Sequence, residues 1–220
     1  MGIGPSRLLV VAAVAAGVVL TSAYAATPAS LLRPLAGAEV DWSAGTVTAS
    51  AGAAADMRMP SPASARPGAE RRARAAAIEK LRAALRALPV RGKQRLEDKT
   101  VEAALGRAST THIEYQSNGG VVLWGQVRFE EVGDVLRTPV AIPVVLAVAA
   151  MPLELAPLLV SGGKEIVAPS ARYHQGPPPA GAISVRRDDK GRLLLPKGSE
   201  ATLDQLAGGP VVIYLQKVLP

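Results

Sequence analysis

The strongest constraint on the fold is a run of apolar side chains at helical spacing in residues 68–88. These side chains recur every three or four residues, so they share one face of a helix. Pro89 ends this helix because it has no amide hydrogen. The face is widened by alanines, which favour close approach to a sheet. Its members are Ile78, Leu81, Leu85 and Leu88, with Ala73, Ala77 and Ala84 beside them.

The segments around this helix alternate at the period of a strand. Residues 41–49 predict a strand, or a hairpin that turns at Ala44–Gly45. Residues 51–67 carry three prolines and predict a loop, and residues 93–105 predict a second, weaker helix. Residues 121–131 predict the most regular strand, and residues 144–150 predict a buried one.

This order predicts an α+β fold: a small, mostly antiparallel sheet with two helices packed on one face, plus a β-rich irregular C-terminal extension. Within the extension, Asp188–Gly191 predicts a hairpin turn, and residues 211–215 predict a buried strand that joins the same sheet. The expected divisions are residues 1–25 as a signal peptide, 26–38 as an extended lead-in, 39–160 as the α+β domain and 161–220 as a Pro/Gly-rich extension docked on it.

The first residues have the pattern of a secretory signal. Arg7 precedes the apolar run Leu8–Leu20, and Ala23 and Ala25 stand at −3 and −1 of an expected cleavage site. The run is shorter than the roughly 20 residues of a membrane span. We therefore expect an exported protein of the periplasm or the outer-membrane periphery. The alternative is an uncleaved N-terminus that anchors the chain in the inner membrane.

Composition limits the chemistry of the chain. The 220 residues include no Cys, which excludes disulfides, thiolate metal sites and Cys nucleophiles. The net charge is +7, and eleven of the 25 Lys and Arg residues fall between Arg66 and Lys99. The basic helix face is either a solvated surface or a site for anionic lipid or peptidoglycan carboxylates. Export argues against nucleic acid. The candidate partner-binding arginines are Arg71, Arg72, Arg74, Arg82 and Arg86.

No motif predicts an enzyme, a cofactor or a metal site. His112 and His174 stand far apart without a partner at ligand spacing. Ser161–Lys164 is only a fragment of a phosphate loop, and the acidic pairs at 130–131 and 188–189 fit a strand end and a turn. Trp42 and Trp124 are scarce aromatics, each suited to a core position or to a partner interface.

Residues 40–52 (VDWSAGTVTASAG), the Arg/Ala helix after them and the strand Leu123–Val127 (LWGQV) together resemble a bacterial envelope family. That family includes outer-membrane lipoproteins of the LPP type and flagellar outer-membrane protein P, which assembles into rings. The resemblance covers roughly residues 39–150. It implies a non-enzymatic protein that self-associates or docks on envelope machinery. The lipid-bearing Cys is missing, and residues after about 161 have no counterpart.

The sequence therefore predicts an exported, non-catalytic cell-envelope protein that acts by protein–protein contact, as a homo-oligomer or as a flagellar or envelope-assembly ring component. The alternative is a periplasmic ligand-binding protein or hydrolase whose site is built from dispersed residues. A deep pocket lined by Tyr173, His174 and Asp188 would favour that alternative.

The signal makes a direct prediction. Mass spectrometry of the protein from an expressing bacterial cell should find an N-terminal peptide that begins at Ala26. Ala23→Arg should keep the precursor intact, because the −3 position needs a small residue. Ala36→Arg, which lies beyond the site, serves as the control and should be processed normally. An intact N-terminus in the native protein would instead support the anchored alternative.

Overall fold

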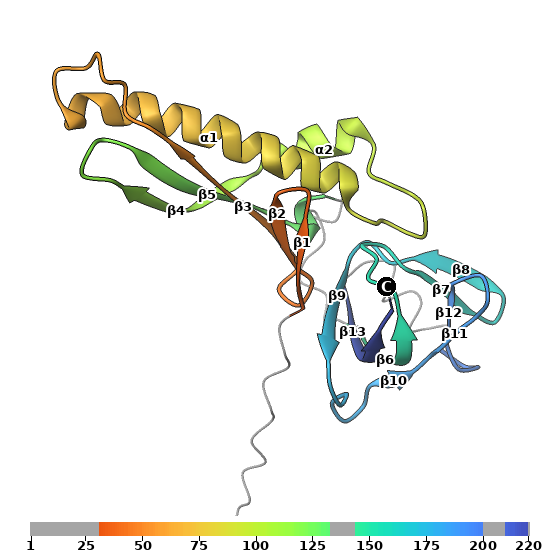
Figure 1. Ribbon diagram of the computed structural model, residues 1–220. Helices are drawn as coiled ribbons and strands as arrows, with labels where there is room; N and C mark the ends of the chain where they lie inside the picture. Colours follow the sequence, from red (N-terminus) through yellow and green to blue (C-terminus); the bar gives the residue numbers. More distant parts are fainter. Residues whose placement is uncertain (1–30, 133–143, 200–209, 220) are drawn as a thin grey trace, which may run out of the picture.

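The computed structural model describes residues 31–132, 144–199 and 210–219. These residues form an α+β fold, as the sequence predicts. Figure 1 shows two side-by-side parts: residues 31–132, here called the N-terminal lobe, and the later described residues, here called the C-terminal lobe. The predicted signal peptide lies outside the described residues. None of the helices in the described part is long and apolar enough to cross a membrane.

The N-terminal lobe is built on one antiparallel sheet with the strand order β1-β2-β3-β5-β4. The predicted hairpin at Ala44–Gly45 is present, with Asp41 opposite Thr46 and Gly45 at a positive φ of 70°. Part of the expected lead-in is also paired, since β1 forms a second hairpin with β2. The strands are β1 (Leu32–Leu35), β2 (Ala38–Asp41), β3 (Thr46–Ala53), β4 (Ser109–Tyr115) and β5 (Val121–Arg128).

Helix α1 (Pro62–Ala87) begins six residues before the predicted start, so residues 62–67 are not a loop. Ser61 accepts a hydrogen bond from the Ser64 amide, and Ser64 bonds back to the Ser61 amide, which together cap the first turn. Pro62 suits the first helical position. Pro67 is tolerated inside the helix because it lies near the exposed N-terminal end, where water can reach the carbonyl it leaves unpaired.

One stripe of α1 covers one face of the sheet (Figure 1). The stripe begins with alanines at four-residue intervals and changes to leucine toward the C-terminal end. The small side chains let the helix approach β3 and β5 closely, and a Cβ placed on Gly125 would lie 3.2 Å from Leu81 Cδ1. The buried members are Ala65, Ala69, Ala73, Ala77, Leu81, Ala84 and Leu85, followed by Leu88 after the helix.

The second helix is shorter than predicted. α2 (Asp98–Leu105) starts at Asp98, because residues 91–94 form a tight turn closed by a bridge between Arg91 and Gln94. Gly92 in that turn has a φ of 54°, a conformation that other residues adopt only with strain. The predicted strand over 121–131 also ends early, at Arg128, and a 3₁₀ turn (Phe129–Glu131) follows it.

The C-terminal lobe contains two further four-stranded sheets. One has the order β10-β6-β13-β9 with parallel neighbours, and the other has the order β11-β12-β7-β8. The predicted turn at Asp188–Gly191 joins β11 to β12. The strands are β6 (Val144–Met151), β7 (Leu158–Ser161), β8 (Lys164–Val167), β9 (Ala171–Gln175), β10 (Ile183–Ser184), β11 (Arg186–Arg187), β12 (Leu193–Leu194) and β13 (Val211–Val218).

Two predicted strands are present but lie in a different sheet from the one expected. β6 and β13 pair with each other in parallel, with Val211 opposite Val144, and neither joins the helix-covered sheet. Both are mainly apolar and, apart from Ala149, Gln216 and Lys217, half-buried or buried, which suits the interior of a parallel sheet. Their apolar pattern predicts burial but does not distinguish one sheet from another.

The packing prediction concerns Gly125. Gly125→Val should lower the free energy of unfolding by about 1–3 kcal/mol, because the added side chain meets Leu81 in a filled interface. Gly52→Val is the matched control: it lies on β3, and a Cβ there has its nearest neighbours at 3.7 Å. Urea unfolding of the three proteins gives the comparison. Equal losses for both variants would contradict close packing at Gly125.

Candidate functional site

The two lobes share one continuous hydrophobic core. Trp42, in the β2–β3 turn, is only 3% exposed and makes edge contacts with Phe129 at 5.2 Å and Tyr173 at 5.8 Å between ring centroids. The Tyr173 amide donates to the Trp42 carbonyl at 2.8 Å. Trp42 therefore belongs to the core and also joins the N-terminal lobe to β9.

A second set of contacts ties the end of α1 to the segment after β6. The Leu155 and Ala156 amides donate to the Pro89 and Val90 carbonyls, both at 2.9 Å. The Gly92 amide donates to Glu154 Oε1 at 2.7 Å. Because these bonds are spread along both chain segments, the segments meet in a fixed register.

From its position in the core, Tyr173 also forms hydrogen bonds to the segment after β6. Its hydroxyl donates to the Glu154 carbonyl at 2.7 Å and accepts from the Glu154 amide at 3.2 Å. Burial raises the pKa of the Tyr173 phenol far above its ordinary value of 10, so the side chain stays neutral and can keep donating. The two bonds satisfy both backbone groups of Glu154 in the core.

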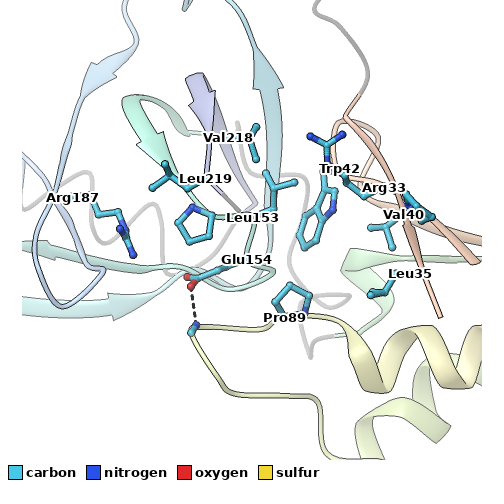
Figure 2. Close-up of a pocket in the computed structure, with 13 residues that line it drawn as sticks. Arg33, Leu35, Val40, Trp42, Pro89, Leu153, Glu154, Arg187, Val218 and Leu219 are labelled. Carbon is cyan, nitrogen blue, oxygen red and sulfur yellow. Dashed lines mark hydrogen bonds between the residues drawn. The ribbon is translucent and has the colours of Figure 1, made fainter.

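A pocket of about 470 Å³ opens where these contacts meet, and we call it the interlobe pocket. Its volume falls within the range of roughly 300–1,000 Å³ typical of small-molecule sites. Figure 2 shows side chains from both lobes around it, with Trp42 and Pro89 opposite Leu153 and Leu219. Its lining is Arg33, Pro34, Leu35, Val40, Trp42, Pro89, Gly92, Pro152, Leu153, Glu154, Arg187, Val218 and Leu219.

Three charged side chains line this mostly apolar pocket. Arg33 on β1 and Arg187 on β11 are exposed, whereas Glu154 is only 8% exposed. Glu154 uses one carboxylate oxygen to accept from the Gly92 amide, as the dashed line in Figure 2 shows. The formal charge of the lining is therefore +1. Such an arrangement can bind an apolar group and orient a polar one, and the described lining residues include no nucleophile paired with a base.

The candidate arginines of α1 do not gather in this pocket. Three of them pair with carboxylates: Arg74 with Glu70, Arg82 with Glu79 and Glu102, and Arg86 with Asp98. The hydrogen bonds that Arg82 donates to Glu102 are the largest cause that raises the pKa of Arg82. Arg72 donates to the Ala54 carbonyl at 2.6 Å, and Arg71 is exposed.

Trp124 lies on the face of the sheet opposite the helix. It is half-buried, and His112 on the neighbouring β4 packs against it with ring centroids 4.9 Å apart. Beside it, Gln126 on β5 donates to the Thr48 hydroxyl at 3.2 Å. This face is therefore polar around one indole, and it lies apart from the interlobe pocket.

The structure does not bring Tyr173, His174 and Asp188 together as a pocket. Tyr173 points into the core. His174 packs against Tyr214, and its burial lowers the pKa of its imidazole. Asp188 caps its own turn by accepting from the Lys190 and Arg192 amides at 3.0 and 2.8 Å.

The other sequence candidates also have local partners. Glu130 pairs with Arg172, and Glu131 accepts from the Arg128 amide at 2.9 Å. Ser161–Lys164 forms the turn between β7 and β8. Asp189 is exposed in the β11–β12 turn.

The sequence did not single out Arg33, Glu154 or Arg187. They lie far apart in the chain and share no motif, so only the docking of the two lobes makes them neighbours. One available signal was Glu154 itself, a lone acid in the apolar segment Val144–Leu159.

No family model, no curated protein and no solved structure matches this chain.

The two hydrogen bonds between the Tyr173 hydroxyl and the Glu154 backbone predict that replacing Tyr173 destabilises the protein in a pH-dependent way. At pH 8, Tyr173→Phe should lower the free energy of unfolding by about 1–3 kcal/mol, because it leaves buried backbone groups of Glu154 unpaired. The folded phenol has a raised pKa, so its protonated form favours the folded state, and this contribution declines as pH rises above 10.

The difference in free energy of unfolding between the native protein and Tyr173→Phe should therefore become smaller above pH 10. Tyr214→Phe is the control, since Tyr214 is half-buried on the adjacent β13. Urea unfolding between pH 8 and 11 measures all three. A gap that stays constant across this range would refute a buried, neutral Tyr173 as the source of the effect.

Proposed function

We propose that the protein is an exported, non-catalytic component of the cell envelope that acts by protein–protein contact with further copies of itself. The observation that carries the proposal is the position of strand β4 at an exposed edge of the helix-covered sheet. β4 pairs with β5 on one side, and the described residues place no strand on its other side. Six of its seven residues are exposed.

An edge strand can bind a second strand through its unpaired backbone groups. Natural edges are often blunted by bulges, and β4 has one between Thr110 and His112. Beyond the bulge, however, residues 112–115 continue in regular register with β5. This stretch supports strand addition.

β4 is also held in place, which reduces the entropy lost on binding. The Tyr115 hydroxyl donates to Glu70 on α1 at 3.3 Å, and the Arg66 guanidinium lies 5.6 Å from the centre of the Tyr115 ring. His112 packs on Trp124. The strand is thus fixed to the helix at one end and to the sheet at its middle.

A second copy is a suitable partner because the same sheet has another edge at β1. Pairing β4 of one copy with β1 of the next extends the sheet head to tail. Such heterologous contacts close into rings when the rotation between copies allows it. This accords with the resemblance to ring-forming flagellar and envelope-assembly proteins. The proposed location, the periplasm or the outer-membrane periphery, is supported by the signal pattern of the first residues.

Lysines on the edge should block self-association. Native protein should show mass that increases with concentration in size-exclusion chromatography with light scattering. The double variant Thr110→Lys with His112→Lys should raise the dissociation constant at least tenfold, about 1.4 kcal/mol, because charged side chains disfavour strand addition.

The control variant carries Ala75→Lys and Ala76→Lys, which add the same charge at exposed positions on α1. It should associate like the native protein. A monodisperse native monomer at high concentration would refute self-association. Association that the edge lysines leave unchanged would place the contact elsewhere.

A further inference from the structure

The interlobe pocket contains no residue of β4 among its described lining. It indicates a second activity, the binding of a small ligand. Its walls come from both lobes, and its shape is fixed by the backbone bonds from Leu155 and Ala156 to residues 89 and 90. A preformed pocket needs little reorganisation to accept a ligand.

The pocket wall is mainly hydrocarbon. Its apolar side chains come from β1, β2, the segment after β6 and the C-terminal end of β13. Trp42 borders the pocket with the small part of its indole that is not covered by the core, where it contacts Phe129 and Tyr173. Displacing water from such a wall favours an aliphatic chain by roughly 25 cal/mol per Å² buried.

The charges of the lining favour an anionic head group. Arg33 and Arg187 approach from different lobes and are both exposed, so their guanidinium groups are accessible to a carboxylate. Figure 2 shows them on opposite sides of the pocket. Among the described lining residues, two arginines stand against one carboxylate, that of Glu154, so the formal excess is one positive charge. The Glu154 carboxylate accepts a hydrogen bond from the Gly92 amide.

We propose that the interlobe pocket binds a single-chain carboxylate amphiphile, a fatty acid, with its chain against Trp42 and its carboxylate at Arg33 or Arg187. The volume of about 470 Å³ suits one aliphatic chain. The ligand is bound and released unchanged.

The chain offers a direct optical assay, because it has only two tryptophans. Trp124→Phe removes the indole on the open face of the sheet and leaves Trp42 as the sole reporter. Titration of this variant with decanoate, below its micelle concentration, should change the Trp42 emission and saturate with a dissociation constant below about 1 mM. Decyltrimethylammonium, with the same chain and the opposite charge, should bind at least tenfold more weakly.

Replacing both guanidinium groups tests the head-group contact. In the Trp124→Phe background, Arg33→Gln with Arg187→Gln should weaken decanoate binding at least tenfold and reduce the preference over decyltrimethylammonium. Arg71→Gln removes an exposed arginine outside the pocket and should change binding less than twofold. Circular dichroism and thermal melting confirm that each variant is folded, which is expected because all three arginines are exposed.

Three outcomes would overturn the proposal. The first is no saturable change in Trp42 emission with decanoate. The second is equal affinity for the two head groups, which would show apolar binding without anion recognition. The third is unchanged affinity in the double variant. The titration reports binding in the pocket, whereas light scattering reports self-association, so failure of this proposal and failure of the proposed function give different results.

Discussion

The packing of Trp42 between the two lobes is the contact on which the rest of the structure depends. The indole meets Phe129 on one side and Tyr173 on the other, and its carbonyl accepts the Tyr173 amide. Only 3% of the chain is aromatic, so three of its few large rings meet at this one place. Aromatic pairs contribute beyond the area they bury. The position of β9, and of the parallel sheet attached to it, follows from this cluster.

The residues that α1 buries explain why the fold needs this contact between the lobes. Its N-terminal half buries alanines against β3 and β5, and alanine provides close contact but little apolar area. That end forms a small separate cluster with Val121 and Leu123. The C-terminal half carries Leu81 and Leu85, Leu88 follows at the end of the helix, and all three belong to the core shared by both lobes. The C-terminal lobe thus completes a core that the helix and its sheet fill only partly.

Local patterns in the sequence predict most of the elements but not how they assemble. Periodicity locates α1, β5 and the β2–β3 hairpin, because each has a one-sided apolar pattern. It misplaces the start of α1, since three prolines suggest a loop and the Ser61–Ser64 cap is less conspicuous. It cannot place β6 and β13, because an apolar strand fits either sheet. Local patterns also cannot identify the charged residues of the pocket. Arg33, Glu154 and Arg187 become neighbours only through contacts between segments that are distant in sequence.

The β1–β2 hairpin links the two proposed activities. Among the described strands β1 forms one edge of the helix-covered sheet, and Arg33 and Leu35 on the same strand line the interlobe pocket. A strand added to β1 would restrict the hairpin, and a ligand in the pocket would contact that hairpin as well. When two binding events bias one element, thermodynamic linkage requires each to change the affinity of the other by the same factor. The four residues of β1 therefore connect the proposed assembly edge to the proposed ligand site.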